Sequence, residues 1–232
     1  NIRKDYVVTD KADGERHLMF IGPTGKIYLI NTNMSVLFTG AVTENEVCFN
    51  SLFDGELILH NKNHAFINLF AVFDAYYMNG TDVRQEKFML DLDVDDEKTL
   101  YRYKIVNNMI TLLKPKSIVG DESSPMTFRS KKFYPETLNS STENDLQIFA
   151  ACNHILEKVQ NGLFEYETDG LIFSHAYYGV GSDKVGIAGP LSKTTWDYSF
   201  KWKPPQFNTI DFLVTTKKSN GDDVITPIFQ PG

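Results

Sequence analysis

The sequence has little cysteine, little net positive charge and no long apolar run. Its 232 residues include only Cys48 and Cys152, and neither lies in a Cys-x-x-Cys pair. This argues against a zinc site or a thioredoxin-type centre and fits a reducing compartment such as the cytoplasm. No apolar stretch approaches the ~18 residues that a membrane-spanning helix needs, so we expect no membrane partner.

Positive charge is scarce as well, since the formal net charge is −7. A protein that coats nucleic acid along its whole surface is normally basic, so any nucleic-acid contact should be local. The candidate basic groups for such a contact are Arg129, Lys131, Lys132, Lys201, Lys203, Lys217 and Lys218.

The sequence begins without methionine and without a signal-peptide pattern, so we expect a fragment of a longer protein. Its length fits one large domain, or one domain and the start of another. Aromatic residues make up 13% of the chain, which favours a sheet-rich fold.

Short apolar runs predict strands and two segments have helical periodicity. The predicted strands are residues 6–9, 17–21, 26–30, 34–38, 56–60, 65–77, 170–173, 200–202 and 210–215. The predicted helices are residues 97–113, ended by Pro115, and residues 143–159, with Thr142 as N-cap and Gly162 as stop.

The residues Lys11-Ala12-Asp13-Gly14-Glu15-Arg16 lie between two predicted strands. A lysine that attacks phosphorus must be neutral, whereas free lysine keeps its proton until about pH 10.4. Neighbouring cations favour the neutral amine, and Arg16 is the first candidate for such a neighbour. Gly14 would let the backbone turn sharply behind the lysine. The alternative interpretation is a surface turn with a solvated lysine.

Four further segments follow in order. They are Phe53-Asp54-Gly55-Glu56-Leu57, Phe70-Ala71-Val72-Phe73-Asp74-Ala75, Thr168-Asp169-Gly170-Leu171-Ile172-Phe173 and Phe200-Lys201-Trp202-Lys203-Pro204. Together with the first segment, they resemble the ordered motifs of the covalent nucleotidyltransferase superfamily, which contains mRNA capping enzymes and polynucleotide ligases. The matched segments span residues 11–203, nearly the whole chain.

Two segments resemble capping guanylyltransferases more than ligases. Ligases usually carry Glu-Gly where this sequence has Asp169-Gly170, and Lys201-Trp202-Lys203-Pro204 is of the capping type. The stretch from Asn208 to Phe212 is also similar to the one that follows the last of these motifs in capping enzymes. The overall similarity is to the multifunctional capping enzymes of large cytoplasmic DNA viruses.

The resemblance implies that Lys11 is the nucleophile and that GTP is the substrate. Arg16 then holds the ribose or the α-phosphate, and Glu56 accepts from a ribose hydroxyl or a hydrated metal. Phe73 stacks on the guanine ring. Glu56 has the alternative of a surface carboxylate at a strand edge, and Phe73 that of an ordinary core aromatic.

The resemblance also implies that Asp169 helps to bind Mg²⁺ or Mn²⁺, cations that prefer oxygen ligands. On a strand, Lys201 and Lys203 would point to one face and Trp202 to the core. The two ammonium groups would then clamp the α-phosphate and favour the neutral form of Lys11. The alternatives are a β-turn aspartate before glycine and two solvated lysines on an edge strand.

The family fold is α+β, with antiparallel sheets flanked by helices and the nucleotide in the groove between them. We expect this nucleotidyltransferase domain over residues 1–208 and the first strands of an oligonucleotide-binding (OB) barrel over residues 209–232. The family's final basic motif is absent.

The implied reaction transfers GMP from GTP through lysyl-GMP to the 5′-diphosphate end of RNA, forming a GpppN cap. Triphosphatase and methyltransferase domains of the same polypeptide and a cytoplasmic or virion location are further implications. A ligase adenylation domain and a non-catalytic nucleotide-binding domain are the alternatives.

Overall fold

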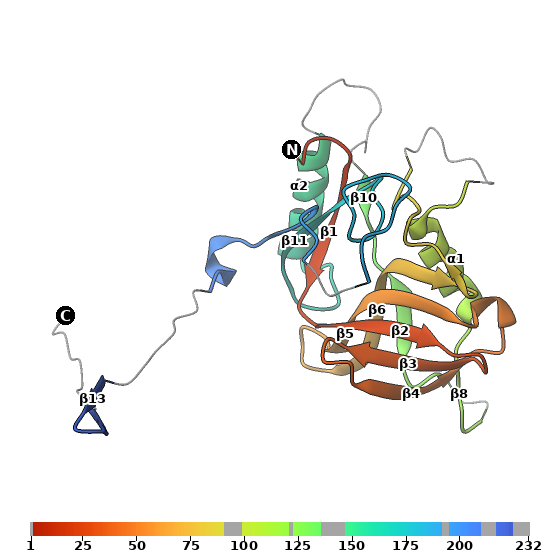
Figure 1. Cartoon of the computed structure of the whole chain (residues 1–232), viewed down its shortest axis with the longest axis horizontal. Helices are drawn as coiled ribbons and strands as arrows, with labels where there is room; N and C mark the ends of the chain where they lie inside the picture. Colours follow the sequence, from red (N-terminus) through yellow and green to blue (C-terminus); the bar gives the residue numbers. More distant parts are fainter. Residues whose placement is uncertain are drawn as a thin grey trace.

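The computed structural model describes residues 2–90, 99–120, 123–135, 147–191, 195–209 and 217–224. Two β-sheets form the centre of this part of the chain, and a helix covers one face of each (Figure 1). The strands pair antiparallel except at one position, so the α+β class with antiparallel sheets and flanking helices is confirmed. No helix in the described ranges is long and apolar enough to cross a membrane.

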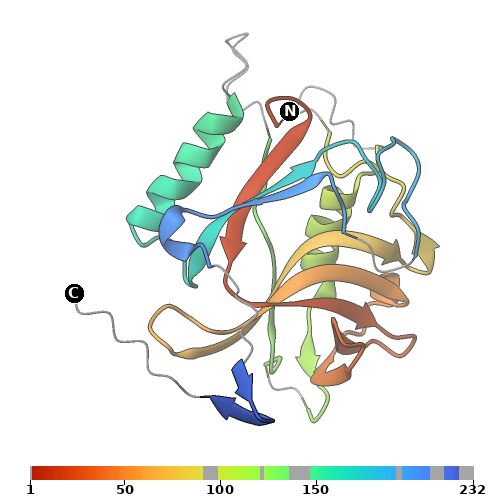
Figure 2. The same cartoon turned by 60° about the vertical axis from the view of Figure 1, so that its left-hand side comes forward.

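The first sheet has the strand order β10-β1-β11-β12. Its strands are β1 (Tyr6–Ala12), β10 (Tyr134–Pro135), β11 (Thr168–His175) and β12 (Ser199–Trp202). β1 is buried on both faces, because Val8 packs toward helix α2 (Gln147–Gln160) while Val7 packs into a different apolar cluster with Phe133. α2 lies along one face of this sheet and buries Ile148, Ala151, Cys152 and Ile155 (Figure 2).

The second sheet has the strand order β7-β6-β5-β2-β3-β4-β8, and β9 pairs parallel to β6. Its strands are β2 (Glu15–Ile21), β3 (Lys26–Asn31), β4 (Val36–Val42), β5 (Ser51–His60), β6 (Phe66–Met78), β7 (Thr81–Asp82), β8 (Lys116–Ser117) and β9 (Thr127–Ser130). Helix α1 (Arg102–Leu113) covers it with Ile105, Val106, Met109 and Leu113.

The chain passes directly from the first sheet to the second between β1 and β2. Gly14 permits this crossing, because a Cβ there would lie 2.6 Å from the Leu57 carbonyl oxygen. Ala12 at the end of β1 packs with Ile58, Leu69 and Ala71 of the second sheet. The two sheets therefore meet at the end of β1, next to Lys11.

Most predicted elements are present, with shifted ends. α1 begins at Arg102, so residues 99–101 are not helical, and it ends at Leu113 before Lys114 in the left-handed conformation. The strand predicted for residues 34–38 begins only at Val36, because Met34 has a φ of 64° in a turn. Residues 97–98, Thr142, residues 143–146 and the predicted strand 210–215 lie outside the described residues.

A separate hairpin joins β13 (Lys217–Ser219) to β14 (Asp222–Val224). The described residues also include short 3₁₀ helices at Glu46–Cys48 and Pro205–Phe207. The hairpin lies within residues 209–232, for which the start of an OB barrel remains a prediction.

Candidate active site

Lys11 lies at the end of β1, opposite a β-bulge in β11. Lys11 pairs with Gly170 and Ala12 with Thr168, so Asp169 is the extra residue of the bulge. A bulge re-aims the side chain of the extra residue. The Lys11 Nζ donates to Asp169 Oδ1 at 2.6 Å, and the two side chains are 17% and 13% exposed.

A second ammonium group reaches the same carboxylate. The Lys203 Nζ lies 2.6 Å from Asp169 Oδ2, so each carboxylate oxygen faces one lysine. Burial alone would raise the pKa of Asp169, but the hydrogen bonds from Lys11 and Lys203 outweigh it and hold the pKa below its usual 3.8. Asp169 is therefore an ionised bridge between two cations.

Gly170 allows β12 to approach this bridge. A Cβ at Gly170, which has a φ of 153°, would lie 2.0 Å from the Trp202 carbonyl oxygen. The prediction that Trp202 is a core residue is wrong, since it is 42% exposed. β12 ends at Trp202, so Lys203 lies just beyond the strand while Lys201 is an exposed strand residue.

Glu56 of β5 interacts electrostatically with the lysines of this site. Burial raises the pKa of its carboxyl group, and the positive charges of Lys131, Lys11 and Lys201 oppose that rise. Glu56 is only half-buried. It is therefore more enclosed than the surface carboxylate of the alternative interpretation.

Arg16 of β2 lies directly across from Glu56 but is paired with another residue. Its Nε lies 3.0 Å from Asp54 Oδ1, and its Nη2 lies 2.5 Å from Asp54 Oδ2. Asp54 is 3% exposed, whereas the Arg16 side chain is 58% exposed. The charge of Arg16 is thus matched by Asp54, an acceptor that the sequence analysis did not single out.

Phe73 also occupies a bulge. Asp54 pairs with Asp74 and Gly55 with Val72, which leaves Phe73 as the extra residue of β6. Its half-buried side chain packs against the cluster that contains Val7 and Phe133. Part of the Phe73 ring is packed and part is accessible. This position is compatible both with stacking on a base and with a role in the core.

A buried polar cluster lies behind the nucleophile candidate. Lys131 Nζ donates to the carbonyl oxygen of Asp10 at 2.6 Å and to Asp10 Oδ2 at 2.8 Å. The Tyr166 hydroxyl donates to the same carboxylate oxygen at 3.1 Å. Lys131 is only 5% exposed, so the prediction that it contributes to a basic surface for nucleic acid is wrong. Nothing in the sequence near Lys131 points to a partner 121 residues away.

The described residues contain no group of three or more His, Cys, Asp or Glu side chains that could hold a metal ion. Asp169 supplies carboxylate oxygens, which Mg²⁺ prefers, but each already faces an ammonium group. Mg²⁺ is commonly held by one or two carboxylates together with substrate phosphates. The residues fit a cation that arrives with phosphate groups, not a closed protein cage.

The sequence matches the family described as mRNA capping enzyme, catalytic domain, over residues 2–205. The chain belongs to this family. It is 30% identical to a "Probable mRNA-capping enzyme" of Acanthamoeba polyphaga mimivirus, over 95% of the chain and 20% of that protein. It is 26% identical to an mRNA-capping enzyme of Danio rerio, over 95% of the chain and 32% of that protein.

A third relative, an mRNA-capping enzyme subunit alpha of Yarrowia lipolytica, is 24% identical over 93% of the chain and 49% of its own length. The chain therefore spans between a fifth and a half of the length of these curated relatives. Among solved structures, a mycobacterial DNA ligase D complexed with ATP and MES matches with a TM-score of 0.45 and 13% identity. That match covers 85% of the chain and 54% of the ligase chain.

In this capping-enzyme domain, the predicted site residues come from both sheets. The first sheet and its edge supply Lys11, Asp169, Lys201 and Lys203, and the second supplies Arg16, Glu56 and Phe73. Direct contacts join Lys11, Asp169 and Lys203, and charge interactions link Glu56 to Lys11 and Lys201. The role of each residue stays a prediction.

Proposed function

We propose that this chain is the guanylyltransferase domain of an mRNA capping enzyme. It transfers GMP from GTP to the 5′-diphosphate end of RNA through a covalent lysyl-GMP intermediate. The observation that carries the proposal is the pairing of Lys11 and Lys203 on the two oxygens of Asp169, within a chain of the capping-enzyme family.

In the first step, the Lys11 amine attacks the α-phosphorus of GTP. Without ligand, the Lys11 Nζ donates to Asp169, so this nitrogen must pass a proton to water before its lone pair can form the N–P bond. As that bond forms, the bond from the α-phosphorus to the β-phosphate oxygen breaks and pyrophosphate leaves with the electron pair. Lys203 and Lys201 then stabilise the charge that develops on the phosphate oxygens.

We propose that Asp169 also binds Mg²⁺ or Mn²⁺ that arrives with the triphosphate. Such a cation neutralises phosphate charge. Asp169 would hold it through the carboxylate oxygens that face Lys11 and Lys203 in the structure. Phe73 stacking on guanine, Glu56 accepting from a ribose hydroxyl and Arg16 holding the ribose or α-phosphate complete the proposed nucleotide site.

In the second step, a terminal phosphate oxygen of diphosphate-ended RNA attacks the same phosphorus. The N–P bond breaks, the nitrogen of Lys11 leaves with the electron pair and takes up a proton from water, and GpppN-capped RNA is released. This step returns Lys11 to its starting form, so the domain can turn over.

Incubation with each of the four nucleoside triphosphates, labelled at the α-phosphate, tests the proposal. We expect label from GTP only, none in Lys11→Ala, and normal labelling in Lys184→Ala, which removes an exposed lysine far along the chain. Label from ATP instead would support the ligase alternative. Binding of GTP without any label, with either Mg²⁺ or Mn²⁺ present, would support the non-catalytic alternative.

We further propose that residues 1–208 form the nucleotidyltransferase domain and residues 209–232 begin an OB-like domain. Triphosphatase and methyltransferase domains would belong to the same polypeptide, acting in the host cytoplasm or in the virion. Closure of an OB domain commonly completes such a site, so we expect this chain alone to bind GTP but to form the adduct slowly.

A further inference from the structure

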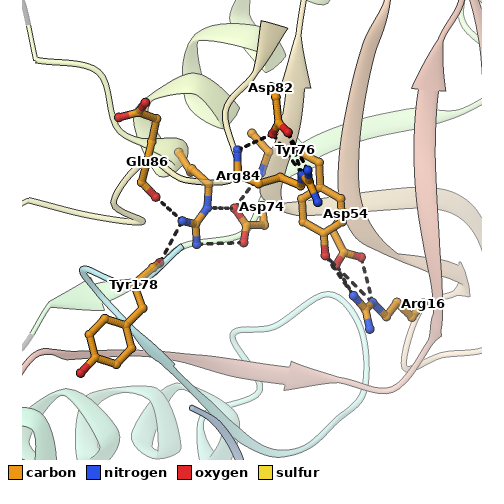
Figure 3. Close-up of polar contacts among 10 residues, drawn as sticks. Arg16, Asp54, Asp74, Tyr76, Asp82, Arg84, Glu86 and Tyr178 are labelled. Atoms are coloured by element: carbon orange, nitrogen blue, oxygen red, sulfur yellow. Dashed lines mark hydrogen bonds and ion pairs between the residues drawn. The ribbon is translucent and has the colours of Figure 1, made fainter. Parts of the chain in front are cut away.

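Arg16, Asp54 and Tyr76 form a closed triangle of hydrogen bonds on the second sheet (Figure 3). The Tyr76 hydroxyl donates to Asp54 Oδ2 at 2.7 Å and accepts from Arg16 Nη2 at 3.1 Å. Arg16 Nε contacts both carboxylate oxygens of Asp54, at 3.0 and 3.2 Å. Each of the three side chains is therefore held by the other two.

A second carboxylate lies next to this triangle and has its own arginine. Asp74 is directly opposite Asp54 on the neighbouring strand. An unpaired carboxylate there would compete with Asp54 for the guanidinium of Arg16. Arg102 Nε instead donates to Asp74 Oδ1 at 2.7 Å, in a fully buried position. Asp74 is thus paired with Arg102, and Arg16 is paired with Asp54.

The hydrogen bonds of the triangle determine which nitrogen atoms of Arg16 remain available to a ligand of the candidate active site. Asp54 and Tyr76 occupy Nε and Nη2, while Nη1 has no partner among the residues that the structure describes. The Arg16 side chain is 58% exposed and lies across from Glu56. Burial raises the pKa of Glu56 and the positive charge of Lys11 opposes that rise, so the two groups are close enough to interact. The open Nη1 edge is therefore the one available to a ligand that also approaches Lys11.

We propose that Tyr76 is a positioning residue of the nucleotide site. Its hydroxyl fixes the Asp54 carboxylate, and the carboxylate orients the guanidinium of Arg16 so that the Nη1 edge is presented to the nucleotide. Tyr76 itself does not touch the nucleotide. This inference rests on the proposed function, because it assigns Arg16 an anionic or hydroxyl-bearing ligand at that site.

Tyr76→Phe tests the proposal, and the chain supplies a matched control. The Tyr77 hydroxyl is hydrogen-bonded to Asp82, and the guanidinium of Arg84 lies over the Tyr77 ring. Arg84 also donates to Asp82 through Nε and Nη2, as Arg16 does to Asp54. In Figure 3 no dashed line joins the Asp82–Arg84 pair to the triangle of Arg16, Asp54 and Tyr76. Tyr77→Phe therefore removes an equivalent hydroxyl from an equivalent ion pair away from Lys11.

The first readout is the rate of GMP-adduct formation at increasing GTP. For Tyr76→Phe we expect the half-saturating GTP concentration to rise about fivefold while the saturated rate stays within about twofold, because a uniform binding contact is loosened. Asp54→Asn should shift it further in the same direction. Tyr77→Phe should match the parent protein. An unchanged half-saturating concentration in both site variants, with folding verified by thermal melting, would overturn the proposal.

The second readout does not need activity. We expect the Nε–H of Arg16, assigned in nitrogen-15 spectra with Arg16→Lys, to exchange slowly with water in the parent protein and about tenfold faster in Tyr76→Phe. No change in that exchange rate would contradict the positioning role. If the parent protein formed no adduct with GTP, the proposed function would fail, and the exchange measurement alone would still decide whether Tyr76 holds Arg16.

Discussion

Arg102 is the side chain whose removal should most weaken this fold. It is completely buried at the start of α1 and forms an ion pair with Asp74 of β6. Its Nη1 also donates to the carbonyl oxygen of Glu86 and, at 3.1 Å, to that of Tyr178, which follows β11. One guanidinium therefore connects α1, the second sheet and a segment that leads out of the first sheet.

The expected loss for Arg102→Met follows from these contacts. Breaking a buried ion pair from one side typically lowers stability by about 3–5 kcal/mol, because the remaining charge is unpaired. Burial raises the pKa of Asp74 and Arg102 opposes that rise, so the carboxyl group can partly relieve the loss by taking up a proton. Two carbonyl groups also lose their donor, at about 1 kcal/mol each. We expect a net loss of about 4 kcal/mol, a large share of the ~5–15 kcal/mol that a domain has.

Urea denaturation followed by tryptophan fluorescence measures this loss. Arg129→Met is the matched control, because Arg129 pairs with Glu165 on the surface, where the two side chains are 57% and 40% exposed. Such an exposed pair contributes at most about 1 kcal/mol. Equal losses for the two variants, or less than ~1 kcal/mol for Arg102→Met, would refute the reasoning.

Two further predictions concern the bulge in β11. The pKa of Asp169 is lowered from 3.8, so the stability from its ion pairs is present above that pH and is lost as the pH falls through the lower folded pKa. Urea midpoints should therefore show Asp169→Asn to be less stable than the parent at pH 7, with the difference shrinking as the pH falls from 3.8 through the lower folded pKa. A difference that stayed constant over that range would contradict the pairing. Gly170→Ala should lower stability by about 2 kcal/mol and abolish adduct formation, because its Cβ would lie 2.0 Å from the Trp202 carbonyl oxygen. A variant with parental melting temperature and labelling would show that the two strands do not need this close approach.

The sequence motifs predicted which residues gather at the site better than they predicted how those residues are held. Lys11, Asp169 and Lys203 were expected in one site, and the structure brings their charged groups together. Lys201 and Lys203 were expected on one strand, but β12 ends at Trp202 and Lys203 lies just beyond it. Simple strand periodicity also cannot locate a bulge, so the positions of Asp169 and Phe73 required the strand register.

Long-range ion pairs were the main feature that the sequence did not indicate. Arg16 was expected to act as a cation near Lys11, but it is matched by Asp54, which looked like a mere neighbour of Glu56 in its motif. Lys131 looked like part of a basic surface, yet it is buried against Asp10. These partners are far apart in sequence. The pairing of β2 with β5 brings Arg16 to Asp54, and the packing of the residues after β9 against β1 brings Lys131 to Asp10.

The central claim is that the amine of Lys11 forms a bond to the α-phosphorus of GTP. Mass spectrometry of a tryptic digest after incubation with GTP and Mg²⁺ tests it directly, because a modified Lys11 is no longer a cleavage site for trypsin. The account predicts one peptide that runs from Asp5 to Arg16 and carries the mass of one GMP. GMP found on any other lysine, with cleavage after Lys11 undiminished, would contradict it.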